Sequence, residues 1–252
     1  MPEYYFRHFL FLQCNTSRCM SYISALVDDF ISLLFPRVCY GCGEHLLRNE
    51  NLICTQCYVS IPRTNFHLDE NNPVAQIFWG RCLIQKSAAF SFYEKGSRIR
   101  KIIHALKYNG IKELGNLMGR IYAIQLKESG FFDGIDVIIP VPLHPSKQKK
   151  RGYNQSECIC GGISEISGLP VNTSVLRRVS SSATQTRRSR YDRWLNVEGI
   201  FDITDCDALR DKHVLLVDDV ITTGATIESC VTALMKIEGI KISIIALAWS
   251  SL

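Results

Sequence analysis

The stretch HVLLVDDVITTGATIESC, residues 213–230, changes its chemistry twice within a short length of chain. Val214 to Val217 form an apolar run of the length expected for a buried strand. Asp218 and Asp219 follow it, and a threonine-rich turn then leads into residues with helical spacing from Ile227 to Leu234. In a parallel sheet, ligands bind at the carboxyl ends of the strands, where backbone N–H groups and a helix N-terminus attract anions. The stretch therefore predicts a phosphate pocket built from a strand, a turn and a helix.

Three other interpretations explain less of this stretch. A P-loop nucleotidase requires the pattern GxxxxGK[ST], and the lysine and the second glycine are missing at that spacing. A response-regulator receiver also places paired acids after an apolar strand. It then needs a phosphate-accepting aspartate and a lysine-bearing strand, and only 33 residues follow Asp219. Capping of a helix by Thr222 or Thr223 would explain one hydroxyl, but not a pair of acids followed by three threonines and a glycine.

Buried strands and amphipathic helices alternate from residue 84 onward. Such alternation predicts an α/β domain with a mostly parallel sheet. Strands are predicted from residue 87, and at about 136–141, 175–179, 197–203, 214–217 and 241–249. Helices are predicted before the stop at Gly110, at about 112–128 and 154–167, and directly after the threonine-rich turn.

Four of the 11 cysteines stand in one block, CYGCGEHLLRNENLICTQC, residues 39–57. The block contains two CxxC pairs, and the chain between them is long enough for a short hairpin that brings both pairs to one metal ion. Four thiolates fill the coordination sphere of Zn²⁺, so the site is predicted to be structural rather than catalytic. Disulfides are the alternative, which a reducing cytosol disfavours. The predicted ligands are Cys39, Cys42, Cys54 and Cys57.

The composition is that of an ordinary globular protein of 252 residues. A net charge of +5 is too small to indicate nucleic-acid binding by itself. No stretch approaches the roughly 18 uninterrupted apolar residues that a membrane helix needs, and the N-terminus lacks the order of a secretory signal. We therefore expect a cytoplasmic protein without membrane insertion.

The chain is predicted to have four parts. Residues 1–35 form an N-terminal extension with an amphipathic helix, and residues 36–62 form the zinc ribbon. Residues 63–83, with two prolines nearby and a polar middle, are predicted to be a linker. Residues 84–252 form the α/β domain.

Two basic stretches each follow a predicted strand, one after the strand at about 136–141 and one after the strand at about 175–179. PVPLHPSKQKKRGYNQSE, residues 140–157, follows a strand and places a cluster of cations at its carboxyl end. Developing negative charge on a phosphate group needs cationic and N–H partners, so Arg151, Gly152 and Tyr153 are predicted to contact such a group. A solvated basic loop is the alternative. SSSATQTRRSRYDRWLNV, residues 180–197, is the second basic stretch.

The thirteen residues VLLVDDVITTGAT, 214–226, resemble without a gap the phosphoribosyl pyrophosphate (PRPP) motif of type I phosphoribosyltransferases. The resemblance implies that Asp218 and Asp219 accept hydrogen bonds from the ribose hydroxyls. It implies that Mg²⁺ is bound by oxygens of ribose and pyrophosphate, which suit this hard cation. It also implies that Arg151, Gly152 and Tyr153 receive the leaving pyrophosphate. The PRPP-binding loop that it implies, with the 5′-phosphate at its threonines, consists of Val220, Ile221, Thr222, Thr223, Gly224, Ala225 and Thr226.

The order of the motifs is similar to that of the ComF family. The cysteine block, LKYNG at residues 106–110, the two basic stretches and the PRPP motif follow one another over residues 21–252. ComF proteins are bacterial phosphoribosyltransferase-like proteins named for a role in DNA uptake during competence. In type I enzymes a flexible loop at the second basic stretch closes over the substrate and excludes water. The corresponding residues are Gln185, Arg187, Arg188 and Arg193, although Arg187 and Arg188 stand where an apolar residue is expected.

These resemblances imply a Mg²⁺-dependent phosphoribosyltransferase, a pentosyl-transferring glycosyltransferase of nucleotide metabolism, over residues 84–252. Asp218, Asp219 and Arg151 would serve the transfer of the phosphoribosyl group to a nitrogen acceptor that the sequence does not identify. The alternative is a non-catalytic sensor of PRPP or a nucleotide, which contacts single-stranded DNA or a competence helicase.

Overall fold

The computed structural model describes residues 36–179 and 200–250. Contacts within the chain divide it into two units, Met1–Thr55 and Gln56–Leu252. The segment 63–83 belongs to the larger unit. Within the described ranges, no helix has the length and apolar character that crossing a bilayer requires.

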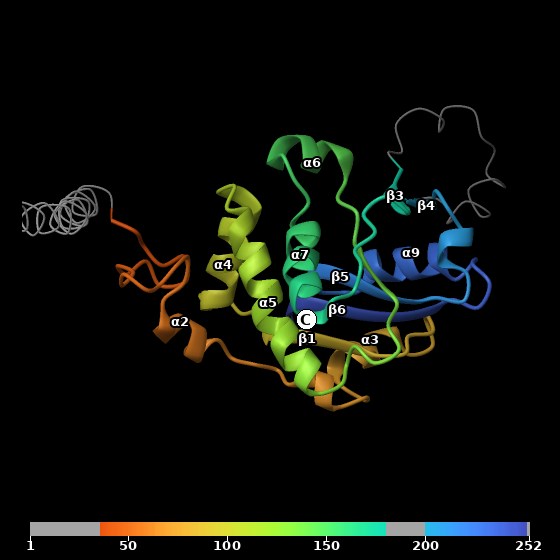
Figure 1. Cartoon of the computed structure of the whole chain (residues 1–252), viewed down its shortest axis with the longest axis horizontal. Coiled ribbons are helices and arrows are strands. Elements are labelled where there is room, and N and C mark those ends of the chain that lie inside the picture. The colour runs from red at the N-terminus through yellow and green to blue at the C-terminus, as the bar shows by residue number, and fades with distance from the viewer. Residues whose placement is uncertain (1–35, 180–199, 251–252) are drawn as a thin grey trace, which may run out of the picture. The chain divides into compact units, whose positions relative to one another are not determined.

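The larger unit contains a four-stranded sheet with the strand order β1-β6-β5-β2 (Figure 1). All three pairings in this sheet are parallel. The predicted α/β class with a mostly parallel sheet is thus confirmed. Its strands are β1 (Ser87–Phe92), β2 (Val137–Pro140), β5 (His213–Ile221) and β6 (Lys241–Trp249). A separate antiparallel pair consists of β3 (Leu176–Arg178) and β4 (Phe201–Ile203).

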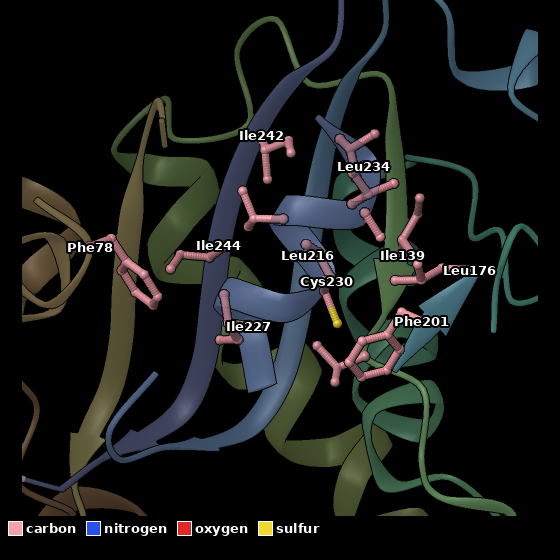
Figure 2. Close-up of a cluster of buried hydrophobic side chains, with 14 of the residues drawn as sticks. Phe78, Ile139, Leu176, Phe201, Leu216, Ile227, Cys230, Leu234, Ile242 and Ile244 are labelled. Atoms are coloured by element: carbon pink, nitrogen blue, oxygen red, sulfur yellow. The ribbon is translucent and has the colours of Figure 1, made fainter. Parts of the chain in front are cut away.

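Side chains of the central strands are buried on both faces of the sheet, as expected when helices cover both. Val214 and Leu216 belong to a core cluster that also contains side chains of α9 (Ala225–Leu234). Figure 2 shows α9 in front of the strands. On the opposite face, the ring of Phe90 lies 5.2 Å from that of Tyr122 in α5 (Lys112–Glu128). Helix α4 (Arg98–Tyr108) packs beside α5.

Helix α7 (Gln155–Ser167) packs against α5 at unusually close range, and glycines make this possible. A Cβ atom on Gly162 would lie 2.0 Å from the carbonyl oxygen of Asn116, and one on Gly119 would lie 2.2 Å from that of Ile159. Both distances are shorter than any van der Waals contact. The backbone contact fixes α7, and with it the first turn of α7 that borders the candidate site.

The segment predicted as a linker, residues 63–83, is part of the fold. It contains a 3₁₀ turn, η1 (Phe66–Leu68), and the helix α3 (Pro73–Phe78), whose Val74 and Phe78 are fully buried in the core cluster. Asn72 is the N-cap of α3, and its side chain accepts hydrogen bonds from the N–H groups of Val74 and Ala75. A cap followed by proline at the first helical position is a helix-start signal. The helix has only six residues and follows a polar segment, so the sequence pattern there resembles that of a linker.

The basic stretch after β2 was expected to be a loop, and most of it is the short helix α6 (Pro145–Arg151), at the top of Figure 1. Gly152 ends this helix in the left-handed region, with φ 79°, and Asn154 caps α7. Proline at the first position of α6 explains why a polar, lysine-rich segment is helical here. The remaining short helices are α2 (Thr55–Ser60) and η3 (Asp207–Leu209).

Candidate functional site

The two acids of the PRPP-like motif lie within a strand that is longer than expected. Strand β5 was predicted to end at Val217, but it continues to Ile221 beside β6. Its other neighbour, β2, ends earlier, with Pro140 paired to Val217. Asp218 is therefore the first residue of β5 beyond the β2 ladder, where the end of the sheet is open to loops on that side.

Asp218 is held by hydrogen bonds in a site that disfavours its charge. Its Oδ1 atom accepts from the backbone N–H of Asp219 at 2.8 Å and from the hydroxyl of Ser156, in the first turn of α7, at 3.3 Å. Burial, followed by the neighbouring carboxylate of Asp219, raises the pKa of Asp218 to about 7. A carboxyl with such a pKa changes its charge near neutral pH, as functional carboxyls often do.

Asp219 is paired with Lys107, which was not among the predicted site residues. The Nζ atom of Lys107 lies 2.9 Å from Oδ1 of Asp219, and the two side chains are 21% and 13% exposed. Lys107 lies in the last turn of α4, where a cation also compensates the partial negative charge of the helix end. In the sequence, only its position in LKYNG, one of the segments that carry the family resemblance, pointed to a role for Lys107.

The loop after the acids contains three exposed threonines at the start of a helix. Thr222, Thr223 and Thr226 are exposed, whereas Ile221 is buried. The N-cap of α9 is Gly224, with φ 75°, and the hydroxyl of Thr223 accepts a hydrogen bond from the N–H of Ala225, the first residue of the helix, at 3.4 Å. Since the first N–H groups of a helix have no partner within it, they are suited to bind an anion. Thr223 thus takes part in capping α9, as the simple alternative expects, while Thr222 and Thr226 are exposed beside it.

The predicted pyrophosphate residues lie beside the end of α4. The guanidinium of Arg151 stacks over the ring of Tyr108 at 5.2 Å, and its Nη1 atom donates to Oε1 of Gln155 at 2.6 Å. The side chain of Tyr153 is buried, and its hydroxyl donates to the carbonyl oxygen of Leu106. Tyr153 therefore joins α4 to α7 through its side chain, which leaves its backbone for the predicted contact with pyrophosphate.

A cavity of about 280 Å³ lies at the carboxyl end of β2, between α6, the first turn of α7 and β3. Asn154, Glu157, Arg177 and Arg178 contribute to its polar lining. Burial raises the pKa of the Glu157 carboxyl. A larger cavity, of about 550 Å³, begins at Asp136 at the amino end of β2, so it lies at the wrong end of the strand for the candidate site.

Not every predicted residue can be placed. The predicted flexible-loop residues, Gln185, Arg187, Arg188 and Arg193, lie outside the described residues.

The four predicted zinc ligands come together. One sulfur atom from each of Cys39, Cys42, Cys54 and Cys57 lies within 4.8 Å of the other three. The sulfur of Cys39 also accepts hydrogen bonds from the N–H groups of Gly41, at 3.3 Å, and Cys54, at 3.2 Å. Such N–H donors stabilise thiolate ligands, and four sulfurs at this spacing fit the tetrahedral coordination of Zn²⁺. The donor set suits a structural zinc ion.

Comparison with known proteins gives the same picture. The phosphoribosyl transferase domain family matches residues 147–251. Competence protein F of Haemophilus influenzae is 26% identical over 219 residues, which cover 83% of this chain and 96% of that protein. Competence protein ComFC of Bacillus subtilis is 24% identical over 200 residues, covering 79% of this chain and 78% of that protein. The DNA utilization protein YhgH of Escherichia coli K12 is 26% identical over 206 residues, covering 79% and 84%.

The domain match covers the PRPP-like motif and both basic stretches except the first residues of the first one. The relatives extend the similarity toward the cysteine cluster, since each alignment spans more of the chain than the domain does. The chain is therefore similar to ComF proteins over most of its length, and it carries a phosphoribosyl transferase domain at residues 147–251.

Proposed function

We propose that the protein binds PRPP together with Mg²⁺ and transfers the phosphoribosyl group to a nitrogen acceptor. One observation carries the proposal. The acid pair Asp218–Asp219 lies near the carboxyl end of a parallel strand, and an exposed threonine loop that opens a helix begins after Val220 and Ile221. A carboxylate pair suits ribose hydroxyls, and a helix N-terminus suits a phosphate dianion.

In this proposal the residues bind and orient PRPP rather than react with it. Asp218 and Asp219 accept hydrogen bonds from the 2′- and 3′-hydroxyls, while the loop of Thr222–Thr226 binds the 5′-phosphate. The lone pair of the acceptor nitrogen forms a bond to C1 of ribose as the bond from C1 to the pyrophosphate oxygen breaks, and the electrons leave with pyrophosphate. Mg²⁺ would neutralise charge on the pyrophosphate and ribose oxygens. Holding the reactants in line accounts for much of the rate increase expected of such a site.

Cations around the acids complete the proposed site. Lys107 balances the charge of Asp219, which keeps two neighbouring carboxylates compatible before the ligand and its metal ion bind. Arg151 and the backbone of Gly152 and Tyr153 would meet the pyrophosphate. The acceptor remains an unidentified nitrogen nucleophile.

Binding of PRPP can be measured by isothermal titration calorimetry in the presence of Mg²⁺. Asp218→Asn should weaken binding by more than about tenfold, the scale of one charge-assisted hydrogen bond. Asp202→Asn, at an exposed position of β4, should bind PRPP as the wild type does. Equal affinity of the wild type and Asp218→Asn would refute the site assignment. Release of pyrophosphate with a panel of bases and amines then tests the transfer itself.

A second candidate function is favoured by the charge of α6. Lys147, Lys149 and Lys150 are all exposed on this short helix, and relatives of the chain are named for competence and DNA utilization. In this alternative the pocket senses PRPP or a nucleotide, and the basic surface contacts single-stranded DNA or a partner in DNA uptake. PRPP binding without pyrophosphate release, together with salt-sensitive DNA binding by fluorescence anisotropy, would support it. A role in DNA uptake during competence is compatible with both the transferase and the sensor.

The cytoplasm is the compartment that we propose for this protein. Cysteine thiolates gathered around a metal ion are typical of reducing compartments, where disulfides are rare. Measurement of the zinc content after purification without reductant and with it would show whether oxidation displaces the metal.

A further inference from the structure

Arg81, which follows α3, connects that helix to the proposed phosphate loop. Its Nη1 atom donates to the carbonyl oxygen of Thr223 at 3.2 Å and to that of Ile77, in α3, at 3.1 Å. Its Nη2 atom forms an ion pair with the carboxylate of Glu228 in the first turn of α9. One guanidinium thus contacts the loop, the helix behind the loop and the helix beneath it.

The hydrogen bond to Thr223 fixes the direction of a whole peptide group. Because a trans peptide is planar, its carbonyl and its N–H point in opposite directions. With the carbonyl oxygen of Thr223 directed toward Arg81, the N–H of Gly224 is directed away from Arg81. Gly224 is the N-cap residue of α9, so this N–H belongs to the group of donors that a phosphate at the helix end would use.

Close packing under Gly224 holds the loop at the same place. A Cβ atom on this residue would lie 2.7 Å from Cγ2 of Ile77 and 2.9 Å from Cε1 of Phe78. The backbone of the loop therefore rests directly on α3. That helix is itself anchored to the sheet, because the buried side chain of Asn72 donates to the carbonyl oxygen of Ser87 in β1 at 2.8 Å.

The ion pair with Glu228 has an electrostatic consequence. A carboxylate in the first turn of α9 lies close to the place where the helix end would bind a phosphate dianion, and like charges repel. The guanidinium of Arg81 neutralises this carboxylate. The same residue therefore orients a donor toward the ligand and removes a charge that would oppose it.

We propose that Arg81 is a positioning residue for the 5′-phosphate: it holds the Thr223–Gly224 peptide with its N–H toward the ligand and screens Glu228. The identity of the ligand rests on the proposed function. Arg81 acts through the loop, so it is distinct from the residues predicted to contact PRPP. It comes from the segment that the sequence suggested was only a linker.

The test separates the 5′-phosphate from the rest of PRPP. Calorimetry on the full-length chain with Mg²⁺ compares PRPP, ribose 5-phosphate and pyrophosphate as ligands of the wild type, Arg81→Met and Arg81→Lys. Arg81→Met should bind PRPP and ribose 5-phosphate about tenfold or more weakly, the scale of a misplaced charge-assisted contact. Its affinity for Mg²⁺-pyrophosphate should stay within about twofold, because that ligand does not use the loop. Arg81→Lys, which keeps the charge but loses the planar fork, should fall between the two.

Arg120→Met is the matched control, since Arg120 forms a similar ion pair with Glu165, at 3.1 Å, between α5 and α7. It should bind all three ligands as the wild type does. Adding Glu228→Gln to Arg81→Met should restore part of the affinity for ribose 5-phosphate, because the opposing charge is gone. Wild-type affinity of Arg81→Met for ribose 5-phosphate, or an equal loss for pyrophosphate, would overturn the proposal.

A spectroscopic measurement makes the result independent of the ligand. The ¹⁵N resonance of the Gly224 amide reports on the hydrogen bond at the preceding carbonyl, so it should shift in Arg81→Met and remain unchanged in Arg120→Met. If the wild type binds neither PRPP nor ribose 5-phosphate, the proposed function fails. An unshifted Gly224 resonance in Arg81→Met would instead contradict the positioning role, whatever the protein binds.

Discussion

Replacing Asp218 with asparagine should make the protein more stable at alkaline pH while it weakens the proposed ligand site. Burial and the carboxylate of Asp219 raise the pKa of Asp218 to about 7 in the folded chain. In the unfolded chain the same carboxyl titrates near its ordinary value, 3.8. Between about pH 4 and pH 7 the folded chain therefore holds a proton that the unfolded chain has released. Stability from this group is present at low pH, falls as the pH rises through this window, and remains lost above it.

The size of the effect follows from the width of that window. Each pH unit between the two pKa values corresponds to on the order of 1 kcal/mol, so ionised Asp218 costs a few kcal/mol at pH 8. Asparagine is neutral and keeps an Oδ1 acceptor for the N–H of Asp219 and the hydroxyl of Ser156. Asp218→Asn should thus exceed the wild type in free energy of unfolding by a few kcal/mol at pH 8, and match it near pH 4.

Urea denaturation at both pH values, followed by tryptophan fluorescence, measures this difference. Asp202→Asn should leave the free energy of unfolding unchanged at either pH, because that side chain is exposed. A variant Asp218→Asn that is no more stable than the wild type at pH 8, or equally stabilised at both pH values, would refute the reasoning. Affinity of the wild type for Mg²⁺-PRPP should also decline as the pH falls below about 7, since a protonated carboxyl is a poorer acceptor for ribose hydroxyls. Ionised Asp218 would thus lower the stability of the folded chain while it favours binding of the ligand, as is common at functional sites.

Three further predictions concern other parts of the chain. Lys107→Met leaves Asp219 largely buried without its counter-charge, and should lower the free energy of unfolding by about 1–3 kcal/mol in urea denaturation. Gly162→Ala forces α5 and α7 apart and should cost more than about 2 kcal/mol by the same measurement, while Gly161→Ala, which has room for a methyl group, should cost less than about 1. Cys54→Ser should reduce bound zinc, measured by elemental analysis, to less than about half of the wild-type content, because three ligands and a hydroxyl hold Zn²⁺ less tightly.

Local patterns in the sequence predicted much of this protein. The PRPP-like motif and the two CxxC pairs each lie within a short window. The strand and the helix of the motif, the parallel sheet and the cluster of four cysteines agree with the predictions. The ends of individual strands differed from the predictions. β5 continues past Val217 because its partner β6 remains beside it, and pairing with a neighbour is not visible in the strand's own residues.

Other features depended on contacts between distant parts of the chain. Arg81 reaches Thr223 across 142 residues, and nothing in the polar segment around Arg81 indicates that partner. Lys107 likewise looks like a solvated residue at a helix end until the fold brings it to Asp219. The sequence alone determined the chemistry of the motif, because strand, acids and threonines are adjacent in it. Only the tertiary structure decided which charges surround the motif and which segment supports its loop, because these depend on how the helices pack across the sheet.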